Sequence, residues 1–149
     1  MPVKQRSSPA LVFRAGEYAC ALGISDVVEI LRPQPVQKLV QMPAGLSGLS
    51  LIRGSAVPVC NLSELLGGGP GVARRLVLIR AGSRRVALAV DAVIGVRDLQ
   101  SLCVESAPSL MGDAGEALEG IARLDRELLL VLRSAKILSS HTWQEIPEP

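Results

Sequence analysis

The sequence is poor in the side chains on which catalysis and base stacking most often depend. Its 149 residues include one histidine, His141, and three aromatic residues, Phe13, Tyr18 and Trp143. A serine or cysteine nucleophile needs a base close to it, and a lone histidine in a polar C-terminal segment is a poor candidate for that base. The few aromatics and the net charge of +2 also argue against a nucleic-acid partner. We therefore expect no catalytic residues and no nucleic-acid ligand.

Cysteine is scarce as well, and its spacing excludes the common cysteine sites. Cys20, Cys60 and Cys103 are odd in number, widely separated and embedded in apolar runs. This pattern favours buried free thiols in a reducing cytosol over disulfides. Because no CxxC pair is present, the sequence predicts neither a redox site nor a metal site, and no cofactor.

Long apolar runs are absent. No segment approaches the roughly 18 apolar residues of a membrane span, and Met1–Ala10 carries Lys4 and Arg6 without an apolar core behind them. Apolar residues nevertheless make up 48% of the chain and charged residues 20%, which is typical of a folded globular protein. We expect a cytoplasmic protein without direct membrane insertion.

What the sequence does contain is a series of short apolar segments separated by turn residues. About ten strands are predicted, and hairpin turns are indicated at 15–16, 53–55, 82–83 and 125–126. The spacing indicates an all-β barrel or sandwich. Residues expected at alternating or buried strand positions are Val57, Val59, Leu88, Val90, Leu128 and Leu130.

The stretch Gly67–Gly71, with four glycines and one proline, is the best internal boundary. It predicts two small barrels, a first at about 11–66 and a second at about 72–138, and an exchange of strands between them at the chain ends is compatible with this order. A flexible N-terminus (1–10), an exposed loop (108–117) and a loose C-terminal tail (139–149) complete the expected organisation. We find no sequence repeat between the halves.

Some polar residues have a predicted structural role. Asn61 can cap a short helix, with Glu64 three residues later. Asp91 follows an apolar strand, where an acid more often caps a turn than serves in catalysis. The glycines at 67–71 do not form a phosphate loop, because a strand rather than Lys-Ser/Thr follows them. The pairs Arg74/Arg75 and Arg84/Arg85 are interpreted as solvated strand ends rather than a phosphate-binding patch.

One block resembles the central motif of the CheW family: a glycine (Gly48), an apolar strand, Arg53-Gly54, and a second strand that contains Pro58 and ends at Asn61-Leu62. Other blocks that resemble the family occur in the expected order along about 11–138. They are 18–22, 27–30, 86–93, 120–121, 128–132 and 137–138.

The resemblance implies two five-stranded SH3-like barrels on one shared apolar core, with short helical turns and no catalytic site. It implies a scaffold that bridges the regulatory domain of a CheA-type histidine kinase and the cytoplasmic tip of chemoreceptors (methyl-accepting proteins), recruited to receptor arrays at the inner membrane. Carried over by position, Glu29, Gly48 and Arg53 match partner-binding residues, Gly54 and Pro58 match the hairpin that holds Arg53 outward, and Asn61 and Asp91 match structural positions.

The chain departs from the family pattern at Leu51, Ala87 and Arg133, where an asparagine, a glycine and an acid are common. These departures bear on which receptor set or paralogous kinase array the protein serves. Alternatives to the chemotaxis adaptor are an adaptor with pilus-based or other non-flagellar output, a small-ligand-binding β-barrel, and a hydrolase. The scarcity of aromatics counts against the ligand-binding barrel, and the lone histidine against the hydrolase.

Overall fold

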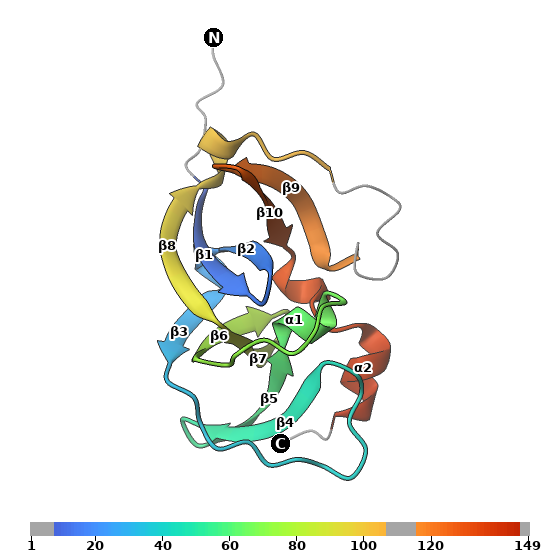
Figure 1. Ribbon diagram of the computed structural model, residues 1–149. Coiled ribbons are helices and arrows are strands. Elements are labelled where there is room, and N and C mark those ends of the chain that lie inside the picture. Colours follow the sequence, from blue (N-terminus) through green and yellow to red (C-terminus); the bar gives the residue numbers. More distant parts are fainter. Residues whose placement is uncertain (1–7, 107–115, 147–149) are drawn as a thin grey trace.

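The computed structural model describes residues 8–106 and 116–146, which fold mainly into strands (Figure 1). One five-stranded sheet takes its strands from both ends of the described chain: β1 (Pro9–Ala15), β2 (Tyr18–Gly23), β8 (Ala92–Asp98), β9 (Leu118–Leu124) and β10 (Glu127–Leu132). The strands of the second sheet are consecutive: β3 (Val27–Leu31), β4 (Leu46–Ile52), β5 (Ser55–Asn61), β6 (Arg75–Ala81) and β7 (Arg84–Val90). We call the two units the terminal barrel and the central barrel. Two small SH3-like barrels are therefore confirmed.

The helical segments are short and connect or follow the strands. They are η1 (Ile24–Asp26), α1 (Leu62–Leu65), η2 (Leu99–Leu102), η4 (Ser134–Lys136) and α2 (Ser140–Glu145). None of the helices in the described residues has the length and apolarity that crossing a membrane requires.

The two sheets have the same topology. The strand order is β8-β1-β2-β10-β9 in the terminal barrel and β3-β6-β7-β5-β4 in the central barrel. Neighbouring strands are antiparallel, except that β2 pairs in parallel with β10 and β5 pairs in parallel with β7. The first hairpin therefore completes the barrel that the last strands of the described chain build. The predicted division into barrels at 11–66 and 72–138 is wrong, because 67–71 is a loop between α1 and β6, which belong to the same barrel. The chain passes from one barrel to the other at η1 and returns at Asp91.

The duplication extends to individual positions. Phe13 pairs with Cys20 in β1–β2 as Ile79 pairs with Val86 in β6–β7. Leu124 pairs with Glu127 in β9–β10 as Ile52 pairs with Ser55 in β4–β5. These registers define equivalent residues in the two barrels, although no repeat is visible in the sequence.

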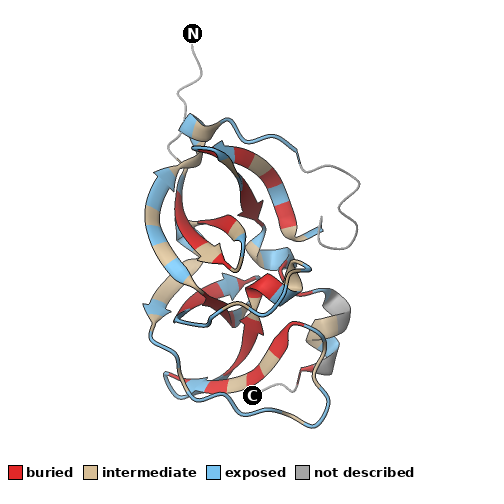
Figure 2. Cartoon of the chain, viewed as in Figure 1, coloured by how far each residue is buried: buried red, intermediate tan, exposed pale blue. Residues whose placement is uncertain are grey.

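Buried side chains form three clusters, and both faces of the central strands contribute (Figure 2). One cluster belongs to the terminal barrel, one to the central barrel, and the largest joins the two. In β1, Val12 lies in the terminal cluster, whereas Phe13 lies in the joint cluster. The middle of β1, residues 10–13, is therefore an unbroken apolar run, because neither of its faces meets water there. The shared core expected from the sequence is thus present.

Five of the six predicted core residues are buried: Val57, Val59, Leu88, Val90 and Leu130. The sixth prediction is wrong, because Leu128 is 63% exposed. The parallel pairing of β10 with β2 starts only at Leu129. Leu128 therefore lies beyond the part of the strand that the other elements cover.

The predicted loose tail is instead partly ordered against the core. Ser139 caps α2, its hydroxyl accepting a hydrogen bond from the Thr142 amide at 3.1 Å. The guanidinium carbon of Arg84 lies 4.2 Å from the centroid of the Trp143 ring, in a cation–π contact, and Ile146 is 5% exposed. Burial of the apolar residues in this segment offsets the conformational entropy that the segment loses when it becomes ordered.

At the N-terminus, Pro9 and Ala10 belong to β1, and Ala10 is fully buried. Residues 1–7 of the predicted flexible N-terminus, 108–115 of the predicted loop and 147–149 of the predicted tail lie outside the described residues.

Candidate partner-binding site

Arg53 stands at the tip of the β4–β5 hairpin. Both residues of this two-residue turn have positive φ, 53° at Arg53 and 82° at Gly54, as in a type I′ turn. A side chain added at Gly54 would meet nothing within 4 Å, so this glycine is required by its backbone conformation rather than by packing. Asp125, at the equivalent position in the terminal barrel, has the same φ of 53°, so this conformation belongs to the turn and places the Arg53 side chain at its tip.

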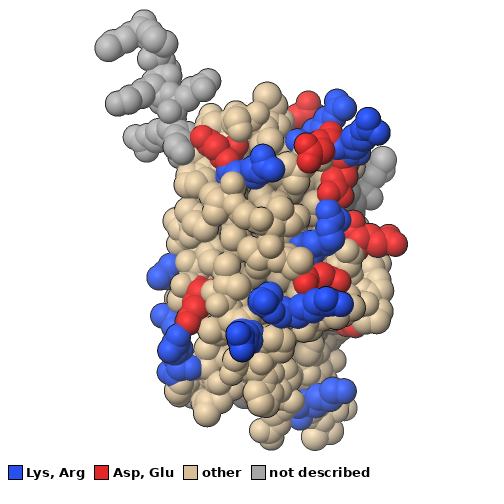
Figure 3. Space-filling view, turned by 60° about the vertical axis from the view of Figure 1, so that its left-hand side comes forward, with Lys and Arg blue, Asp and Glu red and all other residues tan. Residues whose placement is uncertain are grey.

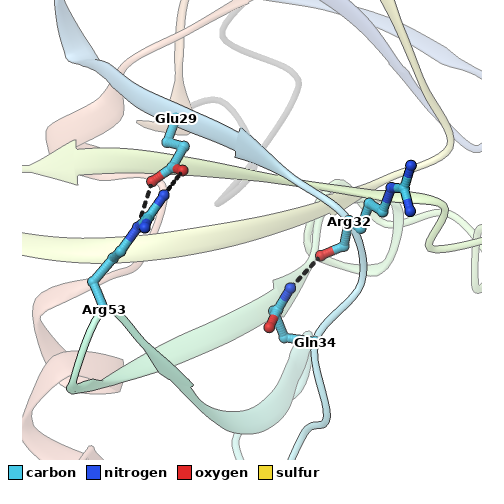
Figure 4. Close-up of polar contacts among 4 residues, drawn as sticks. All are labelled: Glu29, Arg32, Gln34 and Arg53. Atoms are coloured by element: carbon cyan, nitrogen blue, oxygen red, sulfur yellow. Dashed lines mark hydrogen bonds and ion pairs between the residues drawn. The ribbon is translucent and has the colours of Figure 1, made fainter.

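Glu29 lies on β3 and binds Arg53 at two points (Figure 4). The Arg53 Nε donates to Glu29 Oε2 at 3.2 Å, and Nη2 donates to Oε1. The side chains of Arg53 and Glu29 are 67% and 28% exposed. Because β3 and β4 are the two edge strands of the central sheet, the pair links its opposite edges.

The ion pair keeps both side chains charged. Hydrogen bonds from Arg53 lower the pKa of Glu29, and the same hydrogen bonds raise the pKa of Arg53. A carboxylate with a lowered pKa is a poor proton carrier near neutral pH. The arrangement therefore suits recognition of charged groups better than acid–base chemistry.

The chain leaving β3 is also fixed by polar contacts. The Gln34 side-chain amide donates to the Arg32 carbonyl at 3.0 Å, while the Arg32 guanidinium points away from it (Figure 4). Farther along, Gln37 forms an isolated bridge with Leu49 that lays the segment against β4.

Gly48 occupies the position in β4 at which this segment crosses. A side-chain carbon there would lie 2.3 Å from the Gln37 carbonyl oxygen, and the φ of Gly48 is 148°. Gly120 is its equivalent in the terminal barrel, where a side-chain carbon would lie 2.4 Å from the Glu105 carbonyl oxygen. The recurrence shows that the barrel itself requires glycine at this position, whatever binds nearby.

The remaining predicted residues support the hairpin and the junction of the barrels. Pro58 is buried in β5, opposite Leu49. The Asn61 side-chain oxygen accepts a hydrogen bond from the Glu64 amide at 3.3 Å and so caps α1. In the sheet, β5 lies beside β7 and pairs with it only from Val59 onward. Pro58 has no amide hydrogen to donate, and it lies outside this pairing.

Asp91 lies where the chain passes from the central to the terminal barrel. Its Oδ1 accepts from the Gly16 amide at 2.8 Å and its Oδ2 from the Val72 amide at 3.1 Å. The Asp91 amide donates to the Arg14 carbonyl at 2.7 Å. The acid thus binds two distant segments, rather than capping a local turn as the sequence suggested.

Several surface features near these positions were not predicted. Ile30, next to Glu29, is 43% exposed, and Leu51, two residues before Arg53, is 73% exposed. Exposed aliphatic side chains beside charged ones are common in protein-binding surfaces. The only signal in the sequence was the departure at Leu51. Of the other two departures, Ala87 is fully buried and Arg133 is exposed.

Charge is divided unevenly between the barrels. Residues 24–90 contain eight lysines or arginines and three acids, whereas the other described segments contain six and nine. In Figure 3, lysine and arginine predominate among the charged side chains in the lower part of the view, and both signs are mixed in the upper part, where the terminal barrel lies. In the described part of the chain, no three His, Cys, Asp or Glu side chains lie close enough to hold a metal ion.

Comparison with known proteins gives consistent matches over nearly the whole chain. The family model for the CheW-like domain matches residues 9–142. The chemotaxis protein CheW of Treponema pallidum is 24% identical over 154 residues, covering 98% of this chain and 91% of that protein. Protein FrzA of Myxococcus xanthus is 28% identical over 134 residues, covering 86% and 83%.

A solved structure shows the same fold. The crystal structure of the scaffolding protein TtCheW from Thermoanaerobacter tengcongensis superimposes with a TM-score of 0.79 at 24% identity. The match covers 92% of this chain and 96% of that one.

Proposed function

The chain belongs to the CheW-like domain family, and from this membership we propose that it is a non-enzymatic adaptor that couples chemoreceptors to a CheA-type histidine kinase. Its function is that of a scaffold in chemotaxis or related signal transduction. The kinase and receptor partners are the specific part of the proposal.

The observation that carries the proposal is the Glu29–Arg53 pair. It presents two fixed charges of opposite sign beside the exposed Ile30 and Leu51. A partner with complementary charges can exchange contacts with either member, and its apolar groups can cover the neighbouring aliphatic side chains. We assign Glu29 and Arg53 to partner binding, and Gly48 to the strand that ends at Arg53.

The partners that this proposal names are the kinase regulatory domain and the cytoplasmic tip of methyl-accepting chemoreceptors. Binding to the tip would hold the protein on the cytoplasmic side of the inner membrane, in a receptor array. No cofactor is required for such a role, since it consists of holding two proteins together.

A second candidate is an adaptor in a paralogous array with pilus-based or other non-flagellar output. The similarity to protein FrzA fits this alternative. A small-ligand-binding barrel is less well supported, because each barrel has its own cluster of buried side chains, such as Leu129 and Val131 in one and Val57 and Val59 in the other.

A pull-down from native cell extract tests the proposal. The tagged chain should retain a histidine kinase and a chemoreceptor together, and the identity of the receptor would distinguish the chemotaxis array from a paralogous one. Recovery of neither class, from an extract shown to contain both, would contradict the adaptor function.

A further inference from the structure

The duplicated barrels allow their equivalent positions to be compared, and one comparison identifies a missing acid. In the terminal barrel, the Arg14 guanidinium donates to Glu127, Nη2 to Oε1 at 2.6 Å and Nη1 to Oε2 at 3.3 Å. Arg14 lies on β1 and Glu127 on β10, and Ala19 of the intervening strand β2 pairs with Arg14. The small alanine leaves the space in which the two longer side chains meet.

The central barrel has different residues at the same places. Arg80 is equivalent to Arg14, since Arg80 pairs with Arg85 as Arg14 pairs with Ala19. Ser55 is equivalent to Glu127, since it pairs with Ile52 as Glu127 pairs with Leu124. The central barrel thus has Ser55 where the terminal barrel has Glu127, and Arg85 where the terminal barrel has Ala19. An ion pair in one barrel corresponds to two arginines without a carboxylate in the other.

The other contacts in the described residues do not supply this carboxylate. Arg80 donates to the Ser25 carbonyl at 3.1 Å, and Arg84 lies over Trp143. Arg85 is exposed and forms no hydrogen bond or ion pair within the described segments. Glu29 is already engaged by Arg53, whose hydrogen bonds are the main cause of its lowered pKa, and the charge of Arg85 adds to that effect only weakly.

A surface hollow of about 510 Å³ is lined by residues 55–58 and 83–85, which include Ser55 and Arg85 but not Arg80. Four of the lining residues have polar or charged side chains: Ser55, Ser83, Arg84 and Arg85. Arginine binds carboxylates at two points, and hydroxyls can donate to the same oxygens. The hollow therefore has donors, positive charge and room for an acidic side chain.

We propose that this hollow binds a carboxylate from an acidic segment of a partner protein, in the place that Glu127 fills in the terminal barrel. The identity of the partner rests on the proposed adaptor function, but the chemistry of the hollow does not. A protein carboxylate is favoured over nucleic acid because the terminal barrel uses a carboxylate at the equivalent position. In addition, none of the described residues that line the hollow is an aromatic on which a base could stack.

Fluorescence anisotropy of a labelled octaglutamate peptide with the full chain tests this directly, at about 50 mM salt where charge attraction is weakly screened. Arg85→Ala should weaken binding by about fivefold, as expected for an exposed charge pair. Ser55→Glu supplies the missing acid internally and should weaken binding at least as much. Arg126→Ala is the control, because it removes an exposed arginine from the β9–β10 turn of the terminal barrel, next to Glu127, where the acid position is already filled. It should bind within about twofold of the parent.

Equal weakening by Arg85→Ala and Arg126→Ala would show only general charge attraction and would overturn the proposal. Parent-like binding by Ser55→Glu would overturn it as well. Tighter binding of an oligothymidylate of matched charge than of octaglutamate would overturn the choice of a carboxylate. None of these results depends on the kinase or the receptor, so a failure here is distinguishable from a failure of the adaptor function.

Discussion

Arg53 and Glu29 bind each other between the two edge strands of the central sheet, so the ion pair both links these edges and presents two charges on the surface. Removing either side chain changes two things at once, because its partner is left free. Single alanine variants alone therefore do not distinguish a direct contact with a binding partner from the release of the other member of the pair.

Exchanging the two charges makes this distinction. The double variant Glu29→Arg/Arg53→Glu can still form an ion pair, but it presents the charges in reversed positions. We expect its melting temperature to lie within about 2 °C of the parent, since exposed pairs contribute little to stability. Kinase and receptor binding, measured by titration calorimetry, should not be restored. Parent-like binding would mean that only the link between edge strands matters.

Gly48 is expected to be essential for stability. In Gly48→Ala the new methyl group would collide with the Gln37 carbonyl, which should lower the free energy of unfolding by about 2–3 kcal/mol. Gly69→Ala is the control, because a side-chain carbon there would have no neighbour within 4 Å, and it should change stability by about 0.5 kcal/mol or less. Urea denaturation measures both. A Gly48→Ala protein with parental stability and lost partner binding would instead show a direct binding role.

Leu130 and Leu128 form a matched pair on β10, with exposed fractions of 7% and 63%. Leu130→Asp would place a carboxylate in the core that joins the two barrels and should cost at least about 4 kcal/mol, enough to unfold many domains. Leu128→Asp should change stability by about 0.5 kcal/mol or less. Thermal melts followed by circular dichroism check both, and a cooperatively folded Leu130→Asp protein would refute the strand assignment.

The three free cysteines should differ in reactivity. Cys20 and Cys60 are buried, whereas Cys103, which the sequence also suggested to be buried, is exposed at the end of η2. A thiol reagent such as Ellman's should therefore label one cysteine per native chain and three in denaturant. Rapid labelling of all three in the native protein would contradict the burial.

The buried thiols should also make the protein less stable in alkali. Burial raises the pKa of Cys20 to about 12, although Arg14 opposes the shift, and burial raises the pKa of Cys60 as well. An unfolded thiol ionises near about pH 8.5, so above that pH the unfolded state is favoured, by up to about 1.4 kcal/mol per pH unit for each thiol until the folded thiol ionises. Cys20→Ala/Cys60→Ala should flatten this slope between about pH 8.5 and 10. Equal slopes in the parent and in the double variant would contradict this expectation.

The sequence revealed the class of fold because local signals carry it. Short apolar runs and turn pairs gave the hairpins, and Arg53-Gly54 was correctly placed at a tip. The exchange of strands was left open because the parallel pairing of β2 with β10 joins segments at opposite ends of the chain. The helix α2 was missed although a capping residue, Ser139, precedes it, since a six-residue helix gives little periodic signal.

The candidate site was predicted only in part for similar reasons. Glu29 and Arg53 were both expected at partner surfaces, but their pairing depends on the closure of a sheet whose edge strands are not neighbours in the hydrogen-bonded order. The duplication was hidden because equivalent positions hold unlike residues, such as Ser55 and Glu127. What the two barrels share is alternation, turn geometry and a glycine at the crossing of two segments, Gly48 or Gly120.

The most direct test of the adaptor function is the affinity of purified Arg53→Ala, Glu29→Ala and Arg126→Ala for a CheA-type kinase regulatory domain and for a chemoreceptor cytoplasmic tip. All three variants should melt like the parent. Arg53→Ala and Glu29→Ala should each lose roughly 30-fold or more in affinity for at least one partner, while Arg126→Ala keeps both within about twofold. If Arg53→Ala and Glu29→Ala bind both partners as well as Arg126→Ala does, the surface assigned to partner binding is the wrong one.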